Sequence, residues 1–211
     1  MRPRLQVALD LTSLEDALKI AGIVADYIDF LEAGTPLIKV EGLRSVEALK
    51  NEFPDKVVVA DMKTMDTGYL EASLAFKYGA DYSTVMAAAD IDTIRGAIDA
   101  AREYGKGVMV DLMGVSDTGY VAEIAGLGPS FLIVHSGIDM QHRGVTPFAF
   151  LKEICTLDTG IPVGVAGGIK PENITYLKGL TIDLVIVGGY ITKARDPVEA
   201  ATKIREALET L

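Results

Sequence analysis

Two acidic residues and a lysine follow an apolar run near residue 60, where a strand is expected to give way to a helix. Residues 59–66 read Val-Ala-Asp-Met-Lys-Thr-Met-Asp, so Asp61, Lys63 and Asp66 follow one another closely. The two-residue period of an extended strand puts Asp61 and Lys63 on the same face. The apolar residues 57–60 indicate a strand buried on both faces. A surface ion pair is one interpretation, but charges at the end of a buried strand favour a reactive site.

Strands and helices alternate along the chain. Short runs rich in Val, Ile and Leu predict eight strands, at residues 5–10, 27–33, 56–63, 82–87, 108–113, 131–136, 161–166 and 184–187. Apolar residues at helical spacing predict a helix after each strand, at residues 13–25, 43–52, 68–78, 91–104, 120–125, 147–155, 171–177 and 197–211. Eight such units favour an α/β fold, a single (β/α)8-barrel domain spanning 1–211. An open doubly wound sheet is the alternative.

A barrel places reactive side chains at the carboxyl ends of its strands. Charged or titratable residues stand there in five of the expected strands, namely Asp10, Glu32, Asp61 with Lys63, Asp111 and His135. The seventh and eighth strands end instead in glycine pairs, Gly167-Gly168 and Gly188-Gly189. We therefore expect one site at the mouth of the barrel, with acids and a histidine on one side and glycines on the other.

The two glycine pairs predict a phosphate site. Glycine leaves backbone amides uncovered, and the loops after the last two strands of a barrel commonly bind phosphate. A lone glycine pair usually serves only a tight turn. Two pairs at equivalent positions of neighbouring units, Gly167-Gly168 and Gly188-Gly189, favour the phosphate interpretation.

The acids predict a hard metal ion. Carboxylates such as Glu32 and Asp61 on neighbouring strands suit Mg²⁺, with Mn²⁺ as a substitute, and such an ion keeps several waters. A divalent ion and Lys63 together would stabilise the negative charge of an enediolate. His135 could exchange a proton at neutral pH, although a lone histidine is often only a hydrogen-bonded polar residue. We interpret His142 as a surface residue.

Composition and charge exclude other classes of partner. The chain has 211 residues, 49% of them hydrophobic, and a formal net charge of -10 at pH 7. A field of this sign repels nucleic acid and anionic membranes. The single cysteine, Cys155, cannot form an intrachain disulfide, and the first residues lead into a strand pattern instead of a signal-peptide core. With no apolar run of membrane-spanning length, these features predict a cytoplasmic protein.

The residues carry a resemblance to a known family. Asp61-Met62-Lys63-Thr64-Met65-Asp66 matches the Asp-x-Lys-x-x-Asp signature of the orotidine monophosphate decarboxylase superfamily. The segments at residues 5–10, 32–39, 165–169 and 187–189 resemble the 3-hexulose-6-phosphate synthases of that superfamily. The resemblance covers nearly the whole chain.

The resemblance implies an aldol reaction. Members of that family reversibly join formaldehyde to D-ribulose 5-phosphate, giving D-arabino-hex-3-ulose 6-phosphate through a magnesium-stabilised enediolate. Asp66 would reach into the site of a neighbouring subunit, which implies a homodimer with shared sites. The implied roles of the other residues are metal binding by Glu32 and Asp61, contact with the enediolate by Lys63, proton transfer by His135, and orientation of substrate or Lys63 by Asp10.

Related activities remain as alternatives. A 3-keto-L-gulonate-6-phosphate decarboxylase shares the signature but carries an arginine three residues after the histidine, where this chain has Ile138. Asp111 likewise suits the synthase better, as a substrate-binding residue, than the longer glutamate of that decarboxylase. A ribulose-phosphate epimerase would commonly need histidine metal ligands, and this chain has only His135 and His142. A non-catalytic phosphosugar-binding barrel would not need both a metal site and an acid-base pair.

Overall fold

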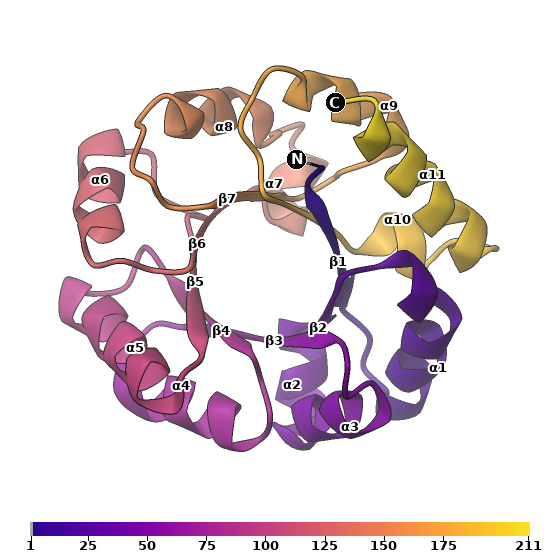
Figure 1. The fold of residues 1–211 in the computed structure, drawn as a ribbon, viewed down its shortest axis with the longest axis horizontal. Coiled ribbons are helices and arrows are strands. Elements are labelled where there is room, and N and C mark those ends of the chain that lie inside the picture. The colour runs from indigo at the N-terminus through magenta and orange to yellow at the C-terminus, as the bar shows by residue number, and fades with distance from the viewer. Residues whose placement is uncertain (1) are drawn as a thin grey trace.

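The computed structural model describes residues 2–211, which form a closed barrel of parallel strands surrounded by helices (Figure 1). Each strand pairs with the next in sequence, and the last pairs with the first. The predicted (β/α)8 barrel is therefore confirmed. Its strands are β1 (Arg4–Leu9), β2 (Phe30–Ala33), β3 (Val57–Thr64), β4 (Tyr82–Met86), β5 (Gly107–Asp111), β6 (Phe131–His135), β7 (Val163–Ala166) and β8 (Leu184–Val187).

The predicted helices form the outer layer, and three short helices that the sequence did not predict follow the carboxyl ends of β2, β6 and β8. The predicted helices are α1 (Leu14–Val24), α3 (Arg44–Glu52), α4 (Gly68–Lys77), α5 (Ile91–Tyr104), α6 (Thr118–Gly126), α8 (Phe148–Cys155), α9 (Pro171–Ile174) and α11 (Pro197–Glu209), with 3₁₀ turns η1 (Ala25–Tyr27) and η2 (Thr175–Leu177). The additional helices are α2 (Thr35–Glu41), α7 (Ile138–His142) and α10 (Gly189–Thr192). They are too short to show a clear period of 3.6 residues. Within residues 2–211, no helix is long and apolar enough to cross a membrane.

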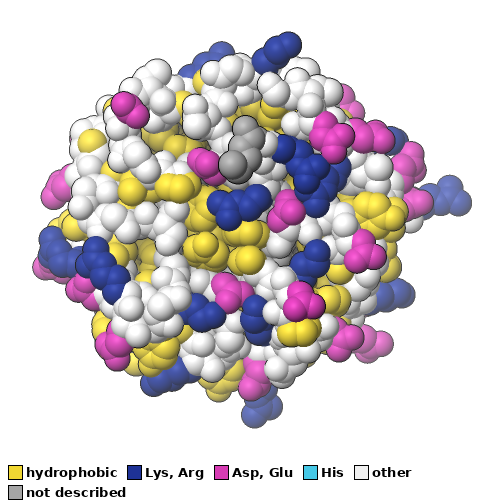
Figure 2. Space-filling model, viewed as in Figure 1, with side chains coloured by type: hydrophobic (Ala, Val, Ile, Leu, Met, Phe, Trp, Pro, Cys, Tyr) yellow, Lys and Arg dark blue, Asp and Glu magenta, His cyan; other side chains and the backbone are white. Residues whose placement is uncertain are grey.

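Side chains on the two faces of the strands make two separate layers of core. Outward-facing residues such as Leu5 and Val7 pack against the helices. Inward-facing residues, among them Phe30 and Phe131, fill the barrel near the start of its strands. The Arg4 guanidinium lies 5.0 Å from the centre of the Phe30 ring and 5.1 Å from that of Phe131. Figure 2 shows hydrophobic surface at the centre of this end, bordered by charged side chains. Because this end is packed, we expect a ligand site inside the barrel at the opposite end.

Three aspartates join neighbouring strands at the packed end. Asp29, Asp81 and Asp183 each immediately precede an even-numbered strand. Each carboxylate accepts a hydrogen bond of 2.8 to 2.9 Å from a backbone amide at the start of the preceding odd-numbered strand. Asp81 also pairs with Lys50 at 2.9 Å and Lys106 at 2.7 Å. These contacts tie the strands at the end of the barrel that lies away from the open mouth.

The ion pairs and the backbone hydrogen bond of Asp81 predict that this residue contributes to stability in a pH-dependent way. Partial burial raises the pKa of Asp81, but hydrogen bonds from Lys106, the Val58 amide and Lys50 outweigh burial and hold that pKa below its ordinary value. A carboxyl with a lowered folded-state pKa stabilises the fold above its unfolded pKa, and this contribution disappears as pH falls through the folded pKa. Asp81→Asn should lower the free energy of unfolding by about 1–3 kcal/mol at neutral pH, since it breaks charged hydrogen bonds.

Urea unfolding at neutral pH and well below the ordinary aspartate pKa of 3.8 measures this effect. The difference between wild type and variant should shrink at the lower pH. Asp55→Asn, at an exposed turn, is the matched control and should change little at either pH. An equal loss for Asp81→Asn at both pH values would contradict the assignment.

Candidate active site

A cavity of about 800 Å³ opens at the carboxyl ends of the strands. Every strand contributes at least one residue to its wall. Asp66 is not among the lining residues. The site residues predicted from the sequence that do line the cavity are Asp10, Glu32, Asp61, Lys63, Asp111, His135, Gly167, Gly168, Gly188 and Gly189.

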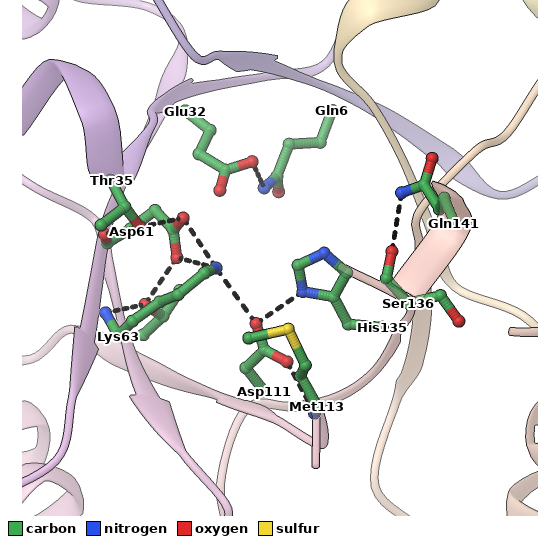
Figure 3. Close-up of polar contacts among 11 residues, drawn as sticks. Gln6, Glu32, Thr35, Asp61, Lys63, Asp111, Met113, His135, Ser136 and Gln141 are labelled. Carbon is green, nitrogen blue, oxygen red and sulfur yellow. Dashed lines mark hydrogen bonds and ion pairs between the residues drawn. The ribbon is translucent and has the colours of Figure 1, made fainter. Parts of the chain in front are cut away.

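Lys63 lies at the centre of the polar wall, between two carboxylates (Figure 3). Its Nζ is 2.9 and 2.8 Å from the two oxygens of Asp61 and 3.2 Å from Oδ2 of Asp111. Burial by itself would lower the pKa of Lys63, but the charges of Asp61, Asp111 and Glu32 outweigh burial and raise it. Lys63 therefore carries a full positive charge, fixed in position at the mouth of the barrel.

The backbone at Lys63 departs from the regular strand that the sequence predicts. Lys63 has φ 46°, in the left-handed region that a residue with a side chain seldom adopts. The β3–β4 register also shifts between Ala60 and Thr64. Asp61 and Lys63 do meet, as the two-residue period suggested, but across an irregular segment. Irregularities of this kind commonly redirect a side chain next to a functional site.

Asp111 connects Lys63 to His135. Its Oδ2 is 2.8 Å from Nδ1 of His135, and its Oδ1 accepts a hydrogen bond of 2.9 Å from the Met113 amide. Burial raises the pKa of Asp111, but the hydrogen bond and charge of His135 and the charge of Lys63 outweigh it and lower that pKa to about 2. An ionised carboxylate only accepts hydrogen bonds, so Nδ1 of His135 carries the proton. Nε2 is then the ring nitrogen that can exchange a proton with a ligand.

Three carboxyl groups lie close enough to repel one another. Burial, followed by the charges of Asp61 and Asp10, raises the pKa of Glu32 well above its ordinary value. Burial and the charge of Asp61 likewise raise the pKa of Asp10. A cation placed among these groups would relieve both burial of charge and repulsion. The donors are therefore of the type that fits Mg²⁺.

The donor set is nevertheless incomplete by itself. Within residues 2–211, no three His, Cys, Asp or Glu side chains converge as a ready-made metal site. Glu32 Oε2 accepts a hydrogen bond of 2.7 Å from Nε2 of Gln6. Both oxygens of Asp61 contact Lys63. A bound ion would take most of its ligands from water and substrate, as Mg²⁺ commonly does in proteins.

Three polar residues that the sequence did not indicate, Thr35, Thr84 and Gln6, hydrogen-bond the carboxylates of the site. Thr35 Oγ1 donates a hydrogen bond of 2.6 Å to Oδ2 of Asp61, and Thr84 Oγ1 donates one of 2.9 Å to Oδ1. Gln6 holds Glu32, and its Oε1 is buried without a hydrogen-bond partner in residues 2–211. Gln6 and Thr84 are polar residues at inward positions of buried strands, a signal that the strand pattern contained.

The glycine side of the cavity serves two purposes. At Gly167, with φ 103°, an added Cβ would collide with the carbonyl oxygen of Ser136, so glycine is required there for packing. At Gly188 an added Cβ would come no closer than 3.4 Å to another atom, so packing does not exclude a side chain there. The amides of Gly167 and Gly168 donate to no acceptor within residues 2–211. These uncovered amides could receive the oxygens of an anion.

Asp66 lies apart from the other predicted site residues. Its side chain is exposed, and Oδ1 accepts a hydrogen bond of 2.7 Å from the Thr67 amide. Thr67 immediately precedes α4 and has φ 51°. Asp66 thus faces solvent next to a strained turn in the single chain, and its role in a neighbouring site stays a prediction.

Known proteins resemble this chain over nearly its full length. Residues 3–204 match the model of the orotidine 5′-phosphate decarboxylase / HUMPS family. The 3-hexulose-6-phosphate synthase of Mycobacterium gastri is 45% identical over 208 residues, which are 97% of this chain and 99% of the relative.

Solved structures give the same result. The crystal structure of 3-hexulose-6-phosphate synthase from Salmonella typhimurium matches with a TM-score of 0.95 and 39% identity, over 98% of this chain and 99% of that one. The structure of 3-keto-L-gulonate-6-phosphate decarboxylase from Vibrio cholerae matches with a TM-score of 0.90 and 33% identity, over 100% of this chain and 99% of that one. These matches confirm the resemblance found through the Asp-x-Lys-x-x-Asp signature, and the chain belongs to the orotidine 5′-phosphate decarboxylase / HUMPS family.

Proposed function

We propose that this chain is an aldol lyase that reversibly adds formaldehyde to D-ribulose 5-phosphate, giving D-arabino-hex-3-ulose 6-phosphate. The observation that carries the proposal is the line of contacts from Asp61 through Lys63 and Asp111 to His135. It combines a fixed positive charge with a proton-transfer group in one cavity, which enediolate chemistry requires. Full-length relatives named 3-hexulose-6-phosphate synthase support the choice of substrate.

In the proposed reaction, a proton leaves C1 of the ketose and the resulting enediolate attacks the carbon of formaldehyde. The former formaldehyde oxygen then takes up a proton. Lys63 presents its ammonium to the oxygens on which negative charge develops. His135 transfers protons through Nε2, and Asp111 holds the ring in the required tautomer and orientation. Mg²⁺ or Mn²⁺ held by Glu32 and Asp61 would supply further positive charge for these oxygens.

A decarboxylase acting on 3-keto-L-gulonate 6-phosphate is the second candidate, because a decarboxylase of that name shares the fold at 33% identity. Ile138 argues against it. This side chain lines the cavity at the start of α7 and is 57% exposed. It provides no charge for a substrate carboxylate, whereas an arginine at this position would. A ribulose-phosphate epimerase is a weaker alternative, because it would commonly need histidine metal ligands and this chain has only His135 and His142. A non-catalytic binding barrel is also weaker, because binding alone would not need both a metal site and an acid-base pair.

One assay separates these functions. Purified protein with Mg²⁺ is incubated separately with hex-3-ulose 6-phosphate and with 3-keto-L-gulonate 6-phosphate, and the one-carbon product is identified. We expect formaldehyde with ribulose 5-phosphate from the first substrate. Release of carbon dioxide from the second substrate alone would identify a decarboxylase, and turnover of neither would favour the epimerase or the binding barrel.

The raised pKa of Glu32 predicts how metal and stability are linked. Between the ordinary pKa of 4.5 and the raised folded-state value, the folded protein binds more protons than the unfolded one, so stability falls as pH rises through this window. In the presence of a chelator, Glu32→Gln should therefore have a higher Tm than wild type at neutral or mildly basic pH. Mg²⁺ should raise the Tm of wild type and leave the variant nearly unchanged.

Differential scanning calorimetry with chelator or with Mg²⁺ measures both effects. Glu52→Gln, an exposed glutamate at the end of α3, serves as the control and should respond to Mg²⁺ as wild type does. A wild type whose Tm and turnover are the same in chelator and in Mg²⁺ would remove the metal from the proposal.

The glycine loops predict the phosphate requirement. In Gly188→Val, the added methyl groups would block close approach of phosphate to the backbone, so KM of the folded variant should rise at least about tenfold. Gly126→Val controls for glycine replacement in general, because a Cβ at Gly126 meets nothing within 4 Å and the residue does not line the cavity. Steady-state kinetics with ribulose 5-phosphate give KM, and an unchanged KM in a folded Gly188→Val would show that this loop is only a turn.

We also propose a homodimer with shared sites. The support is an apolar surface beside Asp66, in which Met65 is 53% exposed, Tyr69 44% and Leu70 57%. Large apolar side chains grouped on a surface commonly mark a contact with another protein chain. A symmetric contact through this surface would bring Asp66 of each chain towards the mouth of its partner.

Complementation between two inactive variants tests this arrangement. If Asp66 acts in the partner's site and Lys63 in its own, the Asp66→Asn and Lys63→Ala homodimers should each be nearly inactive. A mixed dimer then has one site with both groups intact. Random exchange makes about half of the dimers mixed, so activity should recover towards about a quarter of wild type if the sites are independent.

Activity is measured after subunit exchange, and native mass spectrometry establishes that mixed dimers have formed. Lys63→Ala mixed with Lys63→Ala is the control and should stay inactive. Mixed dimers without recovered activity would put Asp66 and Lys63 in the same site, or show that neighbouring sites depend on each other.

A further inference from the structure

The third strand contains extra residues at the point where it enters the site. Ala60 pairs with Ser83 of β4, and the next pair in register joins Thr64 to Val85. Asp61, Met62 and Lys63 therefore stand opposite a single residue of β4, which is Thr84. A regular parallel ladder would match them one to one. The bulge leaves the backbone of these residues without the ordinary partners that a neighbouring strand provides.

The Thr84 hydroxyl provides hydrogen-bond partners for two of these residues, Lys63 and Asp61. Its oxygen accepts a hydrogen bond of 2.8 Å from the amide of Lys63, and its proton is donated to Oδ1 of Asp61 at 2.9 Å. Thr84 is only 6% exposed, so water does not readily replace either bond. One side chain thus holds the backbone of the central lysine and the carboxylate that faces it.

The chemistry of these two bonds requires a hydroxyl. A hydroxyl donates one hydrogen bond and accepts others at the same oxygen, whereas valine of the same shape does neither. Without the Thr84 hydroxyl, the Lys63 amide would lose this acceptor. The Lys63 backbone, with its left-handed φ of 46°, would still be strained. The backbone of Lys63 would then relax towards an ordinary conformation and displace Nζ.

We infer that Thr84 is a positioning residue, whose hydroxyl completes the β3 bulge and holds Lys63 and Asp61 in the geometry that the reaction needs. The effect on rate rests on the proposed function. Phosphate binding on the opposite, glycine side of the cavity does not involve Thr84. Loss of the hydroxyl therefore lowers kcat while KM changes little.

Three variants separate positioning from packing. Thr84→Val removes the hydroxyl at nearly constant volume, and Thr84→Ser keeps the hydroxyl while removing the methyl group. Ser83→Ala is the matched control, because Ser83 is the adjacent residue of β4, is 1% exposed, and has a hydroxyl without a hydrogen-bond partner in residues 2–211. Alternation along β4 turns Ser83 towards the helices and Thr84 towards the cavity.

The experiment compares kcat, KM and Tm for the folded variants in the formaldehyde assay. Thr84→Val should lose about 10²-fold in kcat, the size of effect caused by a misplacement of about 1 Å. Thr84→Ser should keep most of the activity, and Ser83→Ala should match wild type. A Thr84→Val enzyme with wild-type kcat, or a Thr84→Ser enzyme as impaired as Thr84→Val, would overturn the inference.

Hydrogen exchange at the Lys63 amide gives a readout that does not depend on turnover. Exchange should be faster in Thr84→Val than in wild type, and unchanged in Ser83→Ala. If wild type releases no formaldehyde, the proposed function fails, yet this measurement still tests the positioning role. If Thr84→Val does not fold, Thr84→Ala, which removes the hydroxyl without adding a methyl group, takes its place in both measurements. Equal protection of Lys63 with and without the hydroxyl would contradict the inference.

Discussion

The positive charge of Lys63, held between Asp61 and Asp111, is the interaction on which the mouth of the barrel depends. It balances carboxylates that strands β3 and β5 bring together at their ends, and those carboxylates in turn keep it charged. Asp111 extends the contact to His135, which fixes the histidine tautomer. Burial, charge and proton transfer at this site are therefore coupled, since the removal of any one group leaves a partner without its counter-charge or its hydrogen bond.

This arrangement carries a cost in stability. Glu32 and Asp10 have raised pKa values because they are buried near other carboxyl groups, and Lys63 adopts a strained backbone. A strained backbone conformation persists only when contacts with the surrounding structure enforce it. At Lys63 the local support is the Thr84 hydroxyl, while the packed end of the barrel stabilises the fold as a whole, through the rings of Phe30 and Phe131 and the aspartates that tie neighbouring strands. Stability and reactivity are thus placed at opposite ends of the same strands.

Much of the fold and several site residues could be predicted from the sequence. Alternating runs of strand and helix periodicity determine the eight units, because each strand must be buried on both faces and each helix on one. The carboxyl ends of the strands then determine that Asp10, Glu32, Lys63 and His135 share one mouth. The β2 prediction began too early, since Ala25–Tyr27 forms a 3₁₀ turn before the strand starts at Phe30. The short helices were not predicted, because they span too few residues to show a period.

The sequence by itself determined which charged residues stand at the ends of the strands, and the tertiary structure decided how they are held and which uncharged side chains hold them. The role of Asp111 in substrate binding stays a prediction, and the structure adds contacts of its carboxylate with Lys63 and His135 that the sequence did not indicate. Thr84 lies 21 residues from Lys63 in sequence, yet its hydroxyl receives the Lys63 amide. No local pattern contains such a contact. It exists because β3 has a bulge against β4, and a shift in register is a property of two strands packed together, which periodicity along one strand does not record.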